Sequence, residues 1–121
     1  MSESRPAVIP RIFTSDPKGV TAFMRDVLGA EGDDEEGRPA EVRIGGSIVM
    51  VSDGGGVREP MAACAYVRVP SVDAAFTRAL ALGAAVVDPI RPMFWGDRVA
   101  TVRDPFGNLW QIATPTEEAA S

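Results

Sequence analysis

Two stretches of this 121-residue chain are similar to each other. Ala22-Phe23-Met24-Arg25 recurs as Ala75-Phe76-Thr77-Arg78, and both copies run through a helix-like segment into a Gly-Ala pair, at Gly29 and at Gly83. One such unit has too few elements to bury both a helix stripe and a sheet face, so the two copies must pack on each other. The repeat therefore predicts a single domain made of two related modules.

Two helices are predicted, one in each module. Asp16 is placed to cap the first, with Pro17 at its first helical position and Gly29 at its end. Ser71 is placed to cap the second, which ends before Gly83. Apolar residues recur at helical spacing in both and predict a buried stripe on each. The stripes consist of Val20, Phe23, Met24, Val27 and Leu28, and of Val72, Ala75, Phe76, Ala79 and Leu80.

Segments typical of strands surround both helices. In the first half they lie at 7–14, 40–44 and 47–52, with a short acidic stretch near 30–36 after the helix and Gly45-Gly46 as a hairpin turn. In the second half they lie at 63–69, 85–88, 97–103 and 108–113, with Asp104-Pro105-Phe106-Gly107 as the last turn. Each half is thus predicted to be β-α-β-β-β, an α+β arrangement, over about 7–52 and about 62–114. The stretch at about 53–61 is the predicted linker.

Composition argues against several classes of function. The net charge of −5 repels polyphosphate, so we expect no nucleic-acid partner. A single cysteine permits no intramolecular disulfide, and no apolar run approaches the ~20 residues of a membrane span. No secretory leader is recognisable, so we expect a cytoplasmic protein without a membrane partner. The sequence contains no histidine, which is the commonest metal ligand and a frequent general base.

Four motifs carry a resemblance to a known family. They are Val72-Asp73-Ala74-Ala75-Phe76, Ala81-Leu82-Gly83-Ala84, Trp95-Gly96-Asp97-Arg98 and, most specific, Arg103-Asp104-Pro105-Phe106-Gly107-Asn108-Leu109-Trp110-Gln111-Ile112. Over roughly residues 7–114 the chain resembles the vicinal oxygen chelate superfamily of glyoxalases, bleomycin-resistance proteins and extradiol dioxygenases, in particular its small bacterial members. The resemblance implies that the modules curl into a half-open barrel around a concave cavity, and that two chains form a homodimer.

In the enzymes of this superfamily, four side chains from the first and last strands of the modules hold a divalent metal. Matching those positions onto this chain gives Ile9, Met50, Cys64 and Gln111, with Arg11 in place of Ile9 if the register slips by two. Only Gln111 is of a type that ligates the metal in this family. Isoleucine has no donor atom, and a thioether and a thiol are soft donors that suit hard cations poorly. We therefore expect no metal, no cofactor and no catalytic residue.

Period-two alternation predicts which side chains line the cavity. If Gln111 faces it, its neighbours Trp110 and Ile112 pack beneath a helix. The residues expected on the concave face are Ile48, Met50, Cys64, Tyr66, Arg68, Leu109 and Gln111. Tyr66 is the best single polar candidate for contact with a ligand, with ordinary packing as the alternative.

The connection 90–96 is rich in proline and carries two aromatic residues, Phe94 and Trp95. These side chains either stack on a planar ligand or anchor the loop or a dimer contact. Asp97 and Arg98, which follow, are expected to pair with each other or with strand neighbours.

Two other features are assigned ordinary structural roles. Cys64 is expected to be a small buried side chain rather than a thiolate nucleophile, because no histidine is present to activate it. The acidic run at 33–36 matches no calcium-loop spacing and is expected to be a solvated edge strand or loop.

These observations predict a metal-free protein that takes a small aromatic ligand into an apolar groove. Sequestration of an antibiotic or secondary metabolite, as in the bleomycin-resistance relatives, is the most concrete version. The acidic net charge favours a cationic ligand, whereas Arg11 and Arg68 favour an anionic one, so the charge of the ligand stays open. The predicted ligand-binding residues are Arg11, Met50, Cys64, Tyr66, Arg68, Phe94, Trp95 and Gln111.

Two alternatives remain. One is a divalent-metal-dependent lyase, isomerase or dioxygenase of the same superfamily, with an unconventional site that includes Cys64, Gln111 and acids such as Glu41. The other is a dimeric partner or regulatory module that binds no ligand.

Overall fold

The computed structural model describes residues 6–32, 39–54 and 59–116. The elements are β1 (Arg11–Phe13), α1 (Pro17–Leu28), β2 (Glu31–Gly32), β3 (Ala40–Ile44), β4 (Ser47–Ser52), β5 (Cys64–Arg68), α2 (Val72–Ala81), β6 (Ala85–Pro92), β7 (Asp97–Arg103) and β8 (Leu109–Pro115). The order β-α-β-β-β therefore occurs twice, which confirms the predicted α+β class. The acidic run 33–36 and the linker residues 55–58 lie outside the described residues.

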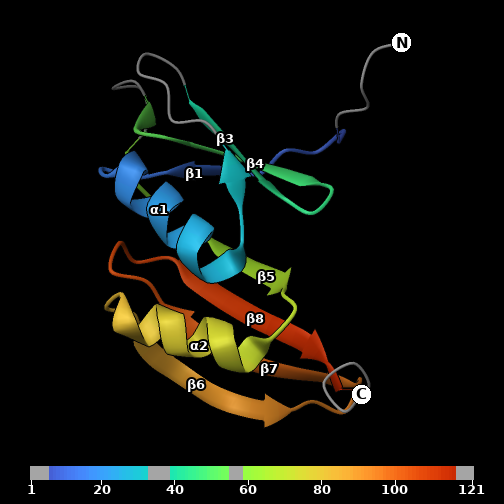
Figure 1. Cartoon of the computed structure of the whole chain (residues 1–121). Helices are drawn as coiled ribbons and strands as arrows, with labels where there is room; N and C mark the ends of the chain where they lie inside the picture. Colours follow the sequence, from blue (N-terminus) through green and yellow to red (C-terminus); the bar gives the residue numbers. More distant parts are fainter. Residues whose placement is uncertain (1–5, 33–38, 55–58, 117–121) are drawn as a thin grey trace.

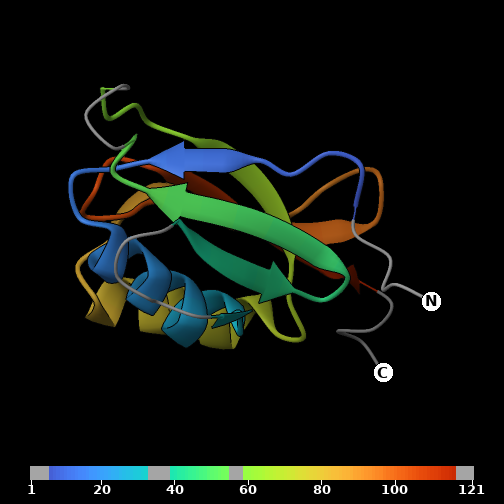
Figure 2. The same cartoon turned by 90° about the horizontal axis from the view of Figure 1, so that it is seen from above.

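The strands form two four-stranded sheets, ordered β1-β4-β3-β2 and β5-β8-β7-β6. In each sheet the first strand of the module pairs in parallel with the last one, and the other pairs are antiparallel. Figure 1 shows the two sheets one above the other with α1 and α2 packed together in front of them. Seen from above, both helices lie on the same side of the strands (Figure 2). Each sheet thus has one face covered by a helix and one face without helices, which we call the open face.

The helix boundaries follow the predicted capping residues. The Asp16 carboxylate accepts a hydrogen bond from the Gly19 N–H at 3.1 Å, and Pro17 opens α1. Gly29 ends that helix in the left-handed conformation, with φ of 73°. Among the described residues, neither helix is long and apolar enough to cross a membrane.

Both modules contribute to one hydrophobic core. The whole predicted stripe of α1 is buried, whereas in α2 Phe76 is half-buried and Leu80 is exposed. Phe23 of α1 stacks on Trp110 of β8, with ring centroids 6.5 Å apart. The N–H of Met61 also donates to the carbonyl of Phe13 at 3.1 Å, which joins the modules beside β1. Neither module would bury these side chains without the other.

Two strands differ from the sequence prediction by more than two residues at one end. β1 is shorter than the predicted 7–14, and β6 continues beyond 88 to Pro92, so the connection that carries the aromatic residues shrinks to 93–96. β6 is an edge strand with two register shifts against β7. Prolines are compatible with a strand at an edge or a bulge, because no neighbouring strand requires their missing N–H. That position explains why Pro89 does not end the strand.

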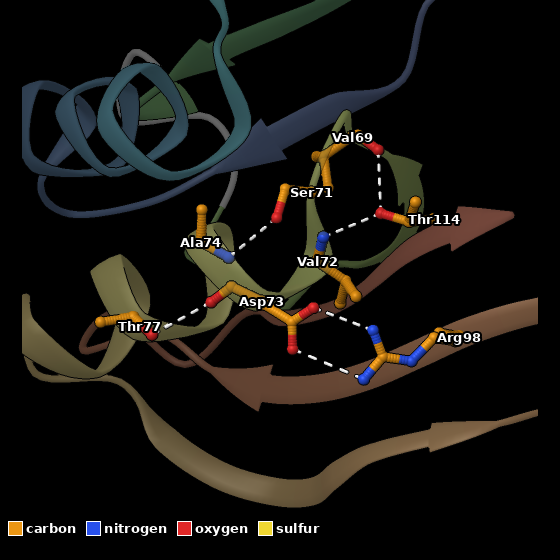
Figure 3. Close-up of polar contacts among 8 residues, drawn as sticks. All are labelled: Val69, Ser71, Val72, Asp73, Ala74, Thr77, Arg98 and Thr114. Carbon is orange, nitrogen blue, oxygen red and sulfur yellow. Dashed lines mark hydrogen bonds and ion pairs between the residues drawn. The ribbon is translucent and has the colours of Figure 1, made fainter. Parts of the chain in front are cut away.

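Polar contacts fix the start of α2 (Figure 3). The Ser71 hydroxyl accepts a hydrogen bond from the Ala74 N–H at 3.2 Å, as its predicted capping role requires. The buried Thr114 hydroxyl accepts from the Val72 N–H at 2.8 Å and donates to the Val69 carbonyl at 3.0 Å. The end of β8 therefore holds the connection between β5 and α2.

Asp73, in the first turn of α2, forms an ion pair with Arg98 of β7 (Figure 3). Arg98 thus pairs with a helix residue and not with Asp97 or a strand neighbour, which corrects the prediction. Consecutive strand residues point to opposite faces of a sheet, so Arg98 turns toward the helix and Asp97 turns away from it.

The Asp73–Arg98 pair gives a testable pH dependence. The hydrogen bond from Arg98, 2.8 Å long, lowers the pKa of the Asp73 carboxyl. A carboxyl whose pKa is lower in the folded state stabilises the fold above its unfolded pKa, and this contribution is lost as the pH falls through the folded pKa. We expect Arg98→Gln to raise the Asp73 pKa toward its ordinary value. An NMR titration of the side-chain carboxyl in both proteins measures this, and an unchanged midpoint would contradict the assignment.

Candidate functional site

The candidate site lies on the open face of the second sheet. The strand register places three rows of side chains there: Cys64-Leu109-Arg103, Tyr66-Gln111-Thr101 and Arg68-Ala113-Val99. The residues between them on β5 and β8 turn to the helix-covered face, as alternation predicts. Those residues are buried or half-buried: Ala65, Val67, Trp110 and Ile112.

An aromatic patch of Tyr66, Phe94 and Trp95 stands on this surface. Tyr66 is 42% exposed, Trp95 52% and Phe94 96%. The rings of Phe94 and Trp95 meet edge to face, with centroids 4.9 Å apart. The Trp95 indole N–H donates to the Tyr66 hydroxyl at 3.2 Å, so the loop between β6 and β7 is bonded to β5. Large aromatic side chains gathered on an exposed surface are typical of a binding site.

A buried carboxylate organises the patch from beneath. Asp97 opens β7 and is only 3% exposed. One of its oxygens, Oδ2, accepts hydrogen bonds from the Tyr66 hydroxyl and, at 3.3 Å, from Arg68 Nη2. Partial burial raises the pKa of Tyr66 above its ordinary value near 10, and the bond to Asp97 raises it further. Tyr66 therefore keeps its proton at neutral pH and donates it to Asp97.

The role of Asp97 was missed by the sequence prediction. Its partners come from β5, about thirty positions away in the sequence, and only the order β5-β8-β7 brings the three strands together. Alternation with Val99 and Thr101 puts Asp97 on the open face, which is the one available signal in the sequence.

The remaining predicted residues of the second sheet, Gln111 and Cys64, belong to these rows. Gln111 is half-buried and lies between Tyr66 and Thr101 in the register. Cys64 is exposed, so the prediction of a buried side chain was wrong. Its row faces the side of the sheet that no helix covers.

Arg11 and Met50 lie on the first sheet, where they are direct partners in the register. Arg11 donates to the Ser52 hydroxyl at 3.1 Å, and its guanidinium lies 5.0 Å from the centre of the Phe13 ring. Ile48, predicted beside Met50 on the cavity wall, is buried. The structure thus brings Tyr66, Arg68, Phe94 and Trp95 together, whereas Arg11 and Met50 make their contacts in the other module.

The positions that hold a metal in related enzymes do not form a suitable donor set here. In the strand register, Met50 is the partner of Arg11 in the first sheet, and Gln111 is the partner of Tyr66 in the second. Ile9 lies two residues before Arg11 and Cys64 two residues before Tyr66, so these two are equivalent positions in the two modules. Isoleucine offers no ligand atom, and the guanidinium of Arg11 would repel a cation. Within the described ranges, no three side chains of Cys, Asp or Glu converge on a point that could hold a metal ion. The residues at these four positions therefore do not fit a divalent metal.

Comparisons with known proteins agree with this architecture. The family model for the Glyoxalase/Bleomycin resistance protein/Dioxygenase superfamily matches residues 7–112. An uncharacterized protein of Mycobacterium bovis is 35% identical over 93% of this chain and 86% of its own length. An uncharacterized protein of Mycobacterium tuberculosis has the same identity over 93% of this chain and 76% of its own length.

Solved structures share the fold. TioX from Micromonospora sp. ML1 has a TM-score of 0.74 at 27% identity, over 93% of this chain and 99% of TioX. The fosfomycin resistance protein FosX from Listeria monocytogenes has a TM-score of 0.67 at 22% identity, over 96% of this chain and 98% of FosX. The fold, the match to the family model and the mycobacterial relatives together show that the chain belongs to the glyoxalase/bleomycin resistance protein/dioxygenase superfamily.

Proposed function

We propose that the protein binds a small aromatic molecule on the open face of its second sheet. The observation that carries this proposal is the exposed aromatic patch of Tyr66, Phe94 and Trp95 beside the guanidinium of Arg68. Aromatic side chains offer a large contact area and lose little conformational entropy on binding. A planar ligand that stacks on them removes apolar surface from water, which favours binding in proportion to the area buried.

Sequestration of an antibiotic or secondary metabolite is the concrete form of this function. Membership of a superfamily named in part for bleomycin resistance supports it. In this proposal the protein works in the cytoplasm as a homodimer. It works without a metal, because Gln111 is the one residue at the four family positions of a type that ligates the metal in this superfamily. A divalent-metal-dependent lyase, isomerase or dioxygenase is the alternative, and it would require acids such as Glu41 in addition to Cys64 and Gln111.

Tryptophan fluorescence tests the proposal directly. The chain has two tryptophans, and Trp110 is buried with its indole N–H bonded to Asp104. Quenching by a ligand at the surface should therefore come mainly from Trp95. We expect planar aromatic antibiotics to quench the emission saturably, at one ligand per chain, with no effect of a chelator. Trp95→Ala removes this reporter, so its binding is followed by calorimetry, and the affinity should fall by about 30-fold, as on loss of a central aromatic contact.

A matched control is Leu82→Ala, which removes another exposed apolar side chain, at the end of α2 on the helix-covered side. It should leave the affinity unchanged. Divalent metals are titrated in parallel after chelation. A tight response to metal without a response to aromatic ligands would favour the enzyme, and no response to either would favour a dimeric partner module.

A further inference from the structure

The hydrogen-bonding capacity of the aromatic patch restricts what it can bind. A tyrosine hydroxyl has one proton to donate, and an indole ring has one N–H. The Tyr66 proton is donated to Asp97, and the Trp95 N–H is donated to Tyr66. Neither group keeps a hydrogen for a ligand. The sequence alone would suggest that Tyr66 donates a hydrogen bond to the ligand, but its proton is already bonded within the protein.

The carboxylate of Asp97, which lies beneath the aromatic patch, is also inaccessible to a ligand. The Asp97 side chain is only 4% exposed, and its Oδ2 atom accepts two hydrogen bonds from the protein. A cationic ligand at the surface would therefore not contact the carboxylate. The overall charge of −5 does not change this, because charges farther away than about 8–10 Å are screened at physiological ionic strength.

Arg68, which lies beside the aromatic patch, keeps free hydrogen-bond donors. Its side chain is 63% exposed, and within the described residues it contacts Asp97 through one atom, Nη2, at 3.3 Å. A guanidinium has five N–H groups in a planar fork, which matches the two oxygens of a carboxylate. Asp97 thus anchors Arg68 beside Tyr66 and leaves the other edge of the guanidinium to the solvent.

We infer that the patch selects planar aromatic ligands that carry an anionic acceptor group, such as an aromatic carboxylate, and that Arg68 determines this specificity. The ring stacks on Trp95 and Tyr66 while the carboxylate accepts hydrogen bonds from Arg68. This inference rests on the proposed function and assigns the charge that the sequence left open.

The competing interaction is the attraction of a cation to the aromatic faces. At an exposed site such a contact raises affinity about two- to fivefold. At an exposed site a guanidinium–carboxylate pair raises the affinity of an anion by up to about fivefold, and the same guanidinium lowers the affinity of a cation by a similar factor. The anionic ligand is therefore favoured.

Three naphthalene probes of the same shape test the charge: 2-naphthoate, 2-naphthylmethanol and 2-naphthylmethylammonium. Binding is followed by calorimetry and by the indole N–H signal of Trp95 in a ¹H–¹⁵N spectrum, where two indole signals are expected. We expect naphthoate to bind about tenfold more tightly than the ammonium probe. Arg68→Gln should abolish this preference, and Arg68→Lys should restore part of it, because lysine keeps the charge but not the planar fork.

Arg103→Gln is the matched control. Arg103 also lies on the open face and loses the same charge, but it ends β7 whereas Asp97 begins it, about 20 Å away. It should keep the preference for naphthoate. Equal or tighter binding of the ammonium probe to the unmodified protein would overturn the inference and leave the proposed function standing, as would a preference that survives Arg68→Gln. If none of the probes binds, the proposed function fails and the inference fails with it.

Discussion

Asp104→Ala is expected to lower the free energy of unfolding by about 3–5 kcal/mol, because the substitution removes a buried carboxylate that accepts four hydrogen bonds. Asp104 is 3% exposed in the turn between β7 and β8. Oδ1 accepts the backbone N–H groups of Phe106, at 2.8 Å, and of Asn108, at 2.9 Å. Oδ2 accepts the Asn108 side-chain amide at 3.0 Å and the Trp110 indole N–H at 2.8 Å. Alanine leaves all four donors without this partner, and two of the residues that donate, Asn108 and Trp110, are buried.

The loss should spread beyond the turn itself. Asn108 Oδ1 accepts the Ala63 N–H at 3.0 Å, so the same turn holds the residue before β5. Urea denaturation of Asp104→Ala measures the effect, with Asp88→Ala as the control, because the Asp88–Arg91 pair lies at the surface and should contribute less than about 1 kcal/mol. A loss below about 1 kcal/mol for Asp104→Ala would show that water replaces the carboxylate.

The second large effect is expected at Gly19, in the first turn of α1. A Cβ atom at this position would lie 2.5 Å from Asp16 Oδ2 and 2.6 Å from the Phe106 ring. Alanine is the better helix former by about 1 kcal/mol, yet overpacking of this kind costs about 1–3 kcal/mol. Asp16 is also the helix cap, so moving it aside weakens its bond to the Gly19 N–H. We therefore expect Gly19→Ala to destabilise the protein.

A double-mutant cycle identifies the cause. If the clash with Phe106 dominates, Gly19→Ala should cost less in the Phe106→Ala background than in the unmodified chain. Gly46→Ala is the control, because a Cβ there meets nothing within 4 Å and the backbone is not left-handed. Stabilisation by Gly19→Ala would show that Phe106 and Asp16 move without cost.

The fold was largely predictable because its signals are local. Helix caps such as Asp16 and Ser71 act within three residues, and alternation within β5 correctly separates the buried and half-buried positions from the exposed ones. The length of β6 was not predictable in this way. Pro89 normally indicates the end of a strand, and only the position of β6 at the sheet edge makes it acceptable there.

The candidate site was predictable only in part, because it depends on contacts between distant strands. Tyr66, Arg68 and Trp95 could be proposed from alternation and from their chemistry. That Asp97 uses the Tyr66 proton requires the register of β5, β8 and β7, which no local pattern reveals. The exposure of Cys64 likewise follows from which face of the sheet the helices cover.

The parallel pairing of the first and last strand in each module determines the order in which the protein can assemble during synthesis. β1 finds its neighbour only when β4 has been made, and β5 must wait for β8, with Cys64 opposite Leu109. The roughly 45 residues from Cys64 to Leu109 take on the order of 2–9 s to translate, at about 5–20 residues per second. During that interval β5 lacks its partner strand and Phe23 of the first module lacks the ring of Trp110. The two modules therefore complete their shared core together, after β8 has left the ribosome, rather than one after the other.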